Sequence, residues 1–231
     1  MASIDLHSSS VLVLGGSGAL GSRIAGRLAD EGALITVAGR SRERLDAVAA
    51  CIPGAATSVF DLSDPHDAHT PVDAAIAAHG RLDGIVNAAG VVAFGLLSDT
   101  DPEVIDEVIA VDLTGPLHLY RYAIPRMDGG FIVNLSGIVA TMPTAGMATY
   151  SAAKAGLSAA TVALTRELRR IGITVIDARP PHTETGLVDR AIAGEAPNLP
   201  PGMSPDAVAD RIVVSIKQGE RVLESESFDA V

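Results

Sequence analysis

Tyr150 and Lys154 stand four residues apart within the run 149–154. On a helix this spacing places both side chains on one face. A free tyrosine has a pKa of about 10 and is a poor base at neutral pH, but a neighbouring lysine ammonium favours the phenolate and lowers that pKa. The pair could therefore transfer a proton. The alternative is an ordinary amphipathic helix that carries two long polar side chains.

A glycine-rich turn near the N-terminus indicates a nucleotide site. The apolar run 11–14 has the pattern of a buried parallel strand, and the glycine run 15–21 and the helical spacing of 22–31 follow it. In this order the glycines let the backbone approach a pyrophosphate, which then lies at the helix N-terminus. A plain tight turn is the alternative. The residues predicted to bind the cofactor here are Gly15, Ser17, Gly18, Leu20 and Gly21.

The end of the second predicted strand, 33–38, carries arginine where an acid would bind the ribose hydroxyls of NAD. Gly39 and Arg40 stand there instead. Arg40, assisted by Ser41 and Arg42, could hold a 2′-phosphate by charge-assisted hydrogen bonds. The alternative is a solvated helix N-terminus, but cations are slightly unfavourable there. The sequence therefore favours NADP(H) as the cofactor.

Apolar strands alternate with helices along most of the chain. Strands are predicted at 11–14, 33–38, 55–60, 82–86, 130–135 and 173–176, and helices at 22–31, 42–51, 65–79, 102–122, 148–170 and 206–217. Pro116 is expected to kink the helix at 102–122 without ending it. This order predicts one α/β domain, a doubly wound parallel sheet of Rossmann type with helices on both faces and ligands at the carboxyl ends of the strands. The residues that fall at those ends are Gly15, Arg40, Asp61, Asn87, Ser136 and Arg179. The further residues predicted to bind the cofactor are Asp61, Leu62, Asn87, Ala88, Ala89 and Gly90.

Composition excludes several classes of function. Acidic residues outnumber basic ones by 28 to 17, and the net charge of −11 argues against a nucleic-acid or anionic-membrane surface. The single cysteine, Cys51, allows no internal disulfide and favours a reducing cytoplasm. No signal peptide and no membrane span are predicted. His66 and His69 lie near acidic residues, but the segment has the pattern of a solvated helix start, so no metal site is expected.

The regular pattern breaks after His182, which could contact substrate or be an ordinary loop histidine. Residues 183–203 mix glycine, proline and scattered apolar side chains, and they are predicted to form a lid beside the crevice. The acidic tail, 224–231, is expected to be loose. The helix at 148–170 is apolar nearly all round, which predicts burial on every side and hence a homodimer through 102–122 and 148–170. The alternative is a helix that is merely rich in alanine.

Taken together, the motifs resemble the short-chain dehydrogenase/reductase family over about residues 10–190. The residues that carry the resemblance are 15–21, Asp61, Asn87 to Gly90, 132–136, Tyr150 to Lys154, Pro180 and Thr183 to Thr185. The resemblance implies hydride transfer between a nicotinamide and a small, mostly apolar carbonyl or alcohol substrate. It implies that Tyr150 moves the proton and that Lys154 lowers its pKa and binds the nicotinamide ribose. Pro180, Thr183 and Thr185 would belong to the cofactor site, with the Thr183 region at the carboxamide.

The family's catalytic serine falls thirteen residues before the tyrosine, and Gly137 stands at that place. Ser136 is one residue earlier, and because side chains alternate along a strand it would normally point the other way. A bulge at the strand end could re-aim Ser136, so it is kept as a catalytic candidate. The other possible donors are the substrate, Thr141, Thr144 and His182.

Three further positions depart from the family pattern. The middle glycine of the turn falls on Ala19, with Gly18 one place early. Asp112 stands where the family has an asparagine that supports the lysine through water. A carboxylate there would keep Lys154 charged and raise the pKa of Tyr150, so Asp112 is a further catalytic candidate. The C-terminus also lacks the strand and glycine pair that usually close these folds, which speaks against the usual tetramer contact.

The sequence thus predicts an NADP(H)-dependent oxidoreductase. The substitutions at Gly137 and Asp112 leave open an NADP(H)-binding sensor or interaction module with little catalysis. A lyase or epimerase on the same fold is a third possibility, which the modest length of the chain disfavours.

Overall fold

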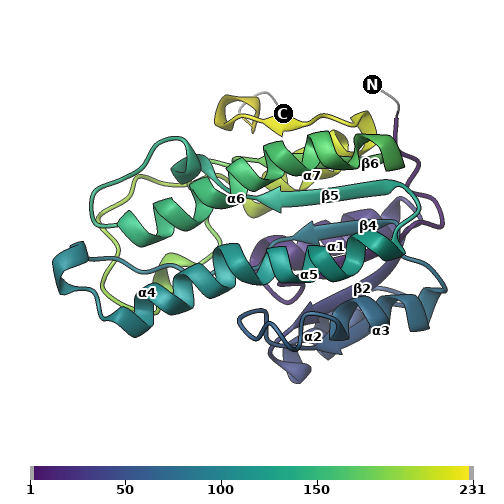
Figure 1. Cartoon of the computed structure of the whole chain (residues 1–231), viewed down its shortest axis with the longest axis horizontal. Helices are drawn as coiled ribbons and strands as arrows, with labels where there is room; N and C mark the ends of the chain where they lie inside the picture. Colours follow the sequence, from purple (N-terminus) through teal and green to yellow (C-terminus); the bar gives the residue numbers. More distant parts are fainter. Residues whose placement is uncertain (1–2, 229–231) are drawn as a thin grey trace.

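The computed structural model describes residues 3–228 and shows one parallel sheet between two layers of helices (Figure 1). The seven strands have the order β3-β2-β1-β4-β5-β6-β7, and every neighbouring pair is parallel. The strands are β1 (Ser10–Leu14), β2 (Leu34–Gly39), β3 (Ala56–Val59), β4 (Gly84–Asn87), β5 (Gly130–Leu135), β6 (Ile173–Ala178) and β7 (Val222–Leu223). The predicted doubly wound, single-domain α/β fold is confirmed.

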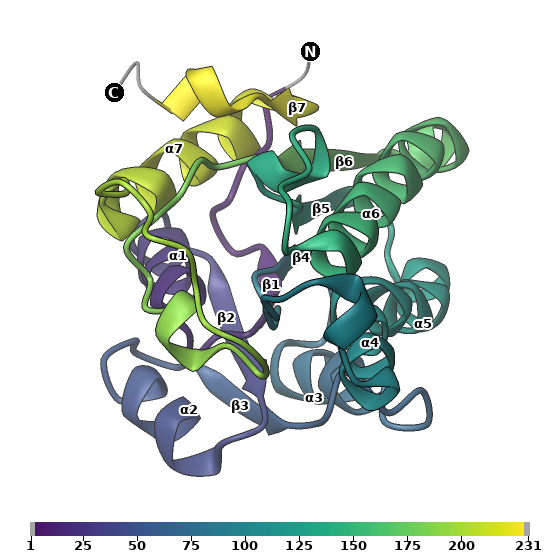
Figure 2. The same cartoon turned by 90° about the vertical axis from the view of Figure 1, so that its left-hand side faces the viewer.

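The helices divide between the two faces of the sheet, and both layers are visible when the molecule is viewed onto the carboxyl ends of the strands (Figure 2). One layer holds α1 (Ala19–Asp30), α2 (Arg42–Ala49) and α7 (Pro205–Gln218), and the other holds α3 (Thr70–His79), α4 (Pro102–Ile109), α5 (Gly115–Ala123) and α6 (Ala148–Glu167). Short 3₁₀ turns are η1 (Leu97–Asp99), η3 (Ile124–Arg126), η4 (Ile138–Ala140), η5 (Leu168–Ile171), η6 (Val188–Arg190) and η7 (Ser225–Phe228). Over residues 3–228, no helix is long and apolar enough to cross a membrane.

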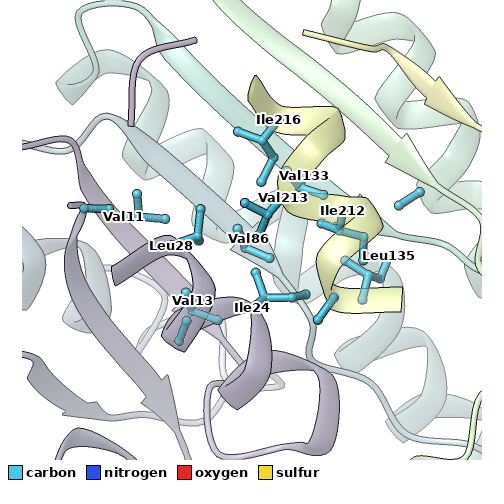
Figure 3. Packing of buried hydrophobic residues seen from close by; sticks show 14 of the residues in the cluster. Val11, Val13, Ile24, Leu28, Val86, Val133, Leu135, Ile212, Val213 and Ile216 are labelled. Carbon is cyan, nitrogen blue, oxygen red and sulfur yellow. The ribbon is translucent and has the colours of Figure 1, made fainter. Parts of the chain in front are cut away.

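The period-two alternation of β1 explains how the sheet receives helices on both faces. Val11 and Val13 pack toward α1 and α7, whereas Leu12 and Leu14 pack toward the opposite layer. Figure 3 shows the first of these cores, where strand valines meet side chains spaced four residues apart on the helices. The labelled helix residues are Ile24, Leu28, Ile212, Val213 and Ile216. Burying each such side chain stabilises the fold by roughly 1.5–3 kcal/mol, so the two layers hold the strand ends that carry the cleft in place.

The third helix begins later than predicted. The sequence predicts a helix from residue 65, but 65–69 form turns and α3 begins at Thr70. The aspartates of this segment cause the difference, because Asp61, Asp64 and Asp67 each accept a backbone N–H from a nearby turn residue. Such local side-chain bonds offer the backbone an alternative to the helix.

The helix predicted at 102–122 continues through Pro116, but it does so by a change of helix type. A π-helical turn, η2 (Ala110–Thr114), joins α4 to α5. Pro116 lacks the backbone N–H that a continuous α-helix would use at this position. Gly115 packs closely against the loop that follows β3, where a Cβ would lie 2.1 Å from the Leu62 carbonyl oxygen. The π turn carries Asp112 into the interior, where it is 1% exposed.

The C-terminus closes the sheet, contrary to the prediction. β7 pairs in parallel with β6, and the side chain of Glu224 accepts two hydrogen bonds from Arg179. Phe228 is 1% exposed in the core. The prediction of a loose tail is therefore wrong for 224–228, and residues 229–231 lie outside the described part of the chain. A two-residue strand is too short to produce a periodic signal in the sequence.

Candidate active site

A cleft of about 620 Å³ opens at the carboxyl ends of the strands, at the point where the strand order reverses between β1 and β4. Figure 2 looks onto these strand ends. The turns after these two strands touch, because a Cβ on Gly15 would lie 2.7 Å from the Ala89 nitrogen. The predicted site residues that line the cleft are Gly15, Ser17, Gly18, Leu20, Arg40, Ser41, Asp61, Leu62, Ala88, Ala89, Gly90, Ser136, Tyr150, Lys154, Pro180, Thr183 and Thr185. Most of the residues singled out from the sequence therefore line one cleft, and their roles in binding stay predictions.

The glycine turn has the shape of a phosphate cradle. Gly15 has a φ of +66°, and a Cβ on Gly21 would meet the Gly15 carbonyl oxygen at 2.2 Å. Gly21 does not line the cleft, so its contribution is the close packing of helix on turn. Gly18 precedes α1 without a side-chain cap, and the first turn of α1 carries no acidic side chain. The helix N-terminus therefore presents unpaired N–H groups to the cleft, which suits the pyrophosphate of a dinucleotide.

Two arginines line the cleft beyond β2, but they are not the pair that the sequence suggests. Arg40 lies there as predicted, whereas Arg42 turns away and donates to the Thr57 hydroxyl at 2.8 Å. Arg44 takes its place in the cleft wall and donates to the Ser17 carbonyl at 2.8 Å. The missed signal is the spacing of Arg44, four residues after Arg40 and in the first turn of α2.

The electrostatics at this end of the cleft mix one acid with the two arginines. Burial acts to raise the pKa of Asp61, but hydrogen bonds from Ser63 and the charge of Arg40 lower it below its ordinary value. Asp61 is therefore an anion beside Arg40. The negative charge of Asp61 therefore compensates part of the positive charge of Arg40, whereas the charge of Arg44 is available to attract an anionic ligand.

Helix α6 places Tyr150 and Lys154 together on the cleft wall. The Lys154 ammonium is buried, donates to the Leu135 carbonyl at 3.1 Å and lies 5.7 Å from the centre of the Tyr150 ring. Asp112 does not line the cleft. It lies behind Lys154, with its Oδ1 3.2 Å from the lysine Nζ.

Burial and Asp112 set the protonation of this group. The pKa of Tyr150 is raised above its ordinary value, first by burial and then by the Asp112 charge, which together outweigh the lowering effect of Lys154. Burial lowers the pKa of Lys154, but Asp112 and Tyr150 raise it, and the net change is upward. Burial raises the pKa of Asp112 to about 6 despite the opposing charge of Lys154. At neutral pH the three groups are therefore a neutral tyrosine, an ammonium and a carboxylate.

Ser136 reaches the cleft wall, but its hydroxyl is turned to a different partner. The hydroxyl donates to Asp177, which also accepts from Ser158 at 2.6 Å and from Arg179 at 2.9 Å. Ser136 is fully buried. Gly137 has a φ of +76°, a conformation in which a serine would be strained. We therefore propose that Ser136 supports Asp177 and does not act on substrate.

Substituting Ser136 with alanine tests this assignment. We expect kcat/KM to fall by no more than about fivefold, and the free energy of unfolding to fall by about 1.5–3 kcal/mol, because one hydrogen bond to a buried carboxylate is lost. A serine that held the developing oxyanion would instead cost about 10²–10³ in kcat. Steady-state kinetics together with denaturant unfolding separate the two results. Ser158→Ala, which removes the other hydroxyl on Asp177, is the matched control.

Two predicted crevice residues lie elsewhere. Arg179 does not line the cleft, because Asp177 and Glu224 hold its guanidinium on the side of β7. Asn87 is buried behind the wall and donates to the Asn134 side chain at 3.3 Å. Both residues lie at the ends of strands, as the sequence predicts. The direction of each side chain is set by a hydrogen-bonding partner far away in sequence, Glu224 for Arg179 and Asn134 for Asn87.

Segment 183–203, the lid segment, crosses the cleft and is pinned at two places (Figure 2). Its ends meet in a parallel bridge between Thr183 and Met203, and its middle pairs with the loop after β4 through Ala93 and Ala193. The apolar residues that line this half of the cleft include Val92, Phe94, Val139, Met142, Leu187, Ile192 and Leu199.

Few polar side chains lie among these apolar residues. Of the possible donors named from the sequence, Thr144 and His182 line the cleft, whereas Thr141 does not and donates to the Ile138 carbonyl. Arg190, a residue that sequence reasoning missed, also lines the cleft from the lid segment. Over residues 3–228, no group of three or more His, Cys, Asp or Glu residues could hold a metal ion.

A parallel sheet in this order, with a glycine turn and a tyrosine–lysine pair on one cleft, defines a Rossmann-type dinucleotide-binding protein. The family model for short chain dehydrogenases matches residues 9–196. The chain therefore belongs to the short-chain dehydrogenase/reductase family of oxidoreductases, as the sequence predicts.

Known sequences and solved structures resemble this chain along nearly its full length. An uncharacterized oxidoreductase of Staphylococcus epidermidis is 30% identical over 215 residues, which are 91% of this chain and 92% of that protein. A dehydrogenase/reductase from Sinorhizobium meliloti superposes with a TM-score of 0.85 at 29% identity and covers 99% of this chain and 98% of its own. A short chain dehydrogenase from Burkholderia cenocepacia, solved in complex with NADP, superposes with a TM-score of 0.86 at 29% identity over 98% of this chain and 100% of its own.

Proposed function

We propose that the protein is an NADP(H)-dependent oxidoreductase that transfers a hydride between the nicotinamide and a small, mostly apolar carbonyl or alcohol. The placement of Tyr150 and Lys154 at the wall of the nucleotide cleft carries this proposal. The cleft supports it further, because the glycine turn suits a pyrophosphate, and Arg40 and Arg44 suit a 2′-phosphate. The similar protein from Burkholderia cenocepacia was solved in complex with NADP.

Each residue has a role that follows from its position. The bound cofactor would supply or accept the hydride. The backbone of 15–21 would bind the pyrophosphate, and Lys154 would bind the nicotinamide ribose on the side that faces Tyr150. Pro180, Thr183 and Thr185, which line the cleft beside the lid segment, would contact the cofactor from that side. Tyr150 gives a proton to the substrate oxygen during reduction and takes one from it during oxidation.

The apolar half of the cleft determines the class of substrate. Its side chains exclude water and offer few hydrogen bonds, so a small apolar carbonyl compound fits better than a charged one. Thr144 and His182 line the cleft, and this supports them as candidate donors to the substrate oxygen in place of the family serine. We propose that the lid segment covers the bound substrate and that its two bridges hold it in this position over the cleft.

The purified protein tests the function directly. We expect NADPH to bind more tightly than NADH and to be oxidised in the presence of at least one member of a panel of aliphatic and aromatic aldehydes and ketones. Absorbance of the reduced nicotinamide follows turnover. A chain that binds neither cofactor would contradict the proposal.

A second candidate function is an NADP(H)-binding module with little turnover. The hydroxyl of Ser136 is bound to Asp177 and Gly137 offers none, so the usual oxyanion donor is absent from the cleft wall over residues 3–228. Tight NADPH binding without turnover on the whole panel would favour this candidate.

We further propose a homodimer through α4, α5 and α6. Helix α6 packs beside α4, but Ala152, Ala159 and Val162 on its outer side are exposed in the single chain. Light scattering should give twice the monomer mass, and Ala159→Arg should give the monomer mass because it places a charge in the apolar contact. Ala47→Arg on the exposed side of α2 is the control that should stay dimeric. A monomeric wild-type chain would rule the dimer out. The cytoplasmic location and the small-molecule partner stay predictions.

A further inference from the structure

Lys154 has a buried acidic partner on its far side from the cleft. The Asp112 Oδ1 lies 3.2 Å from the Lys154 Nζ, and the side chains of the two residues are 0% and 5% exposed. The Val91 N–H donates to the same oxygen at 3.3 Å, while Oδ2 finds no hydrogen-bond partner over residues 3–228. The charge of Asp112 is therefore compensated by Lys154 and little else.

The surrounding backbone fixes this pair in place. The π turn brings Asp112 inward, and Gly90 covers the pair so closely that a Cβ would lie 2.7 Å from Oδ1 and 3.3 Å from the lysine Nζ. The contact is direct and leaves neither charge room to move away. An ammonium held against a carboxylate projects much less positive potential onto a third group than an ammonium alone.

Tyr150 is the third group, and few other charges face it. Asp177 of β6 and Arg179, which follows the end of this strand, pair with each other behind Ser136. On the side of the lid segment the cleft holds His182 and Arg190, and at its far end it holds Arg40, Arg44 and Asp61. Lys154 and Asp112 are the charges that act on the Tyr150 hydroxyl.

We propose that Asp112 is a positioning residue that, through its buried contact with Lys154, neutralises the lysine, holds Tyr150 as a proton donor and thereby sets the site for carbonyl reduction. This inference rests on the proposed function. In reduction, the carbonyl carbon accepts the hydride and the carbonyl oxygen accepts the proton as the Tyr150 O–H bond breaks. The carbonyl is reduced to an alcohol by two electrons that the reduced cofactor loses with the hydride. Solvent then returns a proton to Tyr150. Alcohol oxidation needs the phenolate as base, so it should be efficient only at high pH.

The tyrosine titration of the protein tests the proposal without any substrate. The chain has three tyrosines and no tryptophan, so tyrosinate absorbance in the near ultraviolet is not masked. Tyr120 and Tyr122 have pKa values raised above the ordinary one, by burial and by a hydrogen bond to Asp73 respectively. We expect the wild-type chain and Tyr150→Phe to titrate alike up to about pH 10. A tyrosine that ionises near neutral pH in the wild type and is lost in Tyr150→Phe would overturn the proposal.

Asp112→Asn removes the charge and keeps the shape. We expect the Tyr150 titration to move down by about one to two pH units, since an unopposed ammonium then faces the phenol. The alkaline limb of kcat/KM for reduction should move down by the same amount, and alcohol oxidation at neutral pH should rise roughly tenfold or more.

Asp83→Asn is the matched control. Asp83 is a buried acid that pairs with Arg81 and accepts from the Ser10 N–H at the amino ends of the strands, opposite the cleft. Removing its charge should leave the Tyr150 titration unchanged. If Asp112→Asn lowers the rate but leaves the titration and the pH profile in place, Asp112 is only structural and the proposal fails. If no carbonyl turns over, the proposed function fails while the titration still decides the role of Asp112.

Discussion

Replacing Tyr150 with phenylalanine should lower kcat/KM for carbonyl reduction by about 10²–10⁴-fold and change the affinity for NADPH by only a few fold. Tyr150 lines the cleft and packs its ring against the core, so the variant loses the hydroxyl and keeps the packing. The raised pKa of Tyr150 strengthens this expectation, because a protonated phenol is the form that gives a proton to the substrate oxygen. Initial rates over a range of carbonyl concentrations, together with cofactor titration by fluorescence, give the two quantities.

Tyr122→Phe is the matched control for this result. In the wild type the Tyr122 hydroxyl donates to Asp73 on the surface between α3 and α5, away from the cleft. It should leave kcat/KM unchanged. If Tyr150→Phe reduces substrates as well as the wild type, then another group supplies the proton and the proposed mechanism is wrong. If both variants are impaired equally, the loss reflects folding and not chemistry.

The sequence determines the sheet well because burial on both faces leaves a clear mark. The run 130–135 is a continuous apolar strand between two breaks, and β5 has those bounds. The alternation of strands and helices then predicts one crevice at the carboxyl ends of the strands without any knowledge of side-chain contacts, and the structure has its cleft there, between β1 and β4. The same logic fails for β7, which is held by Arg179, Glu224 and Phe228 more than by its own two residues.

Side-chain direction was the part that the sequence could not supply. Ser136 and Arg179 both fall at strand ends on the cleft side, yet Asp177 holds both. That acid lies 41 residues after Ser136 and gives no local sign of its partners. Arg42 and Arg44 divide in the same way, since two residues span about half a turn of helix and only Arg44 then faces the cleft.

Asp112 shows where a departure from the family pattern is more informative than agreement. The sequence predicts that a carboxylate there keeps Lys154 charged, and the structure places the two groups in direct contact. From the sequence alone, Asp112 is a substitution that weakens the support the usual asparagine gives to the lysine. Its buried contact with Lys154 under Gly90 is what supports the proposal that it favours carbonyl reduction over alcohol oxidation.

Removing the two arginines that line the cleft beyond β2, Arg40 and Arg44, should abolish the preference for NADPH. In Arg40→Ala with Arg44→Ala, we expect the Kd for NADPH to rise by about 10²–10⁴-fold, because each charge-assisted hydrogen bond to a phosphate contributes about 1.5–3 kcal/mol. The Kd for NADH should change by less than about tenfold. Equilibrium titration of the reduced cofactors by fluorescence measures both constants.

The ratio of the two constants is the informative quantity, because Arg44 has a second role. Its guanidinium also donates to the Ser17 carbonyl, so Arg44→Ala alone should loosen the glycine turn and weaken both cofactors. Arg40→Ala has no such contact to lose and should act on NADPH selectively. Arg42→Ala is the control, since Arg42 points to Thr57 and Asp46 and should leave both constants unchanged. Equal losses of NADPH and NADH in Arg40→Ala would show that Arg40 does not read the 2′-phosphate, and the assignment of NADP(H) would then rest on Arg44 alone.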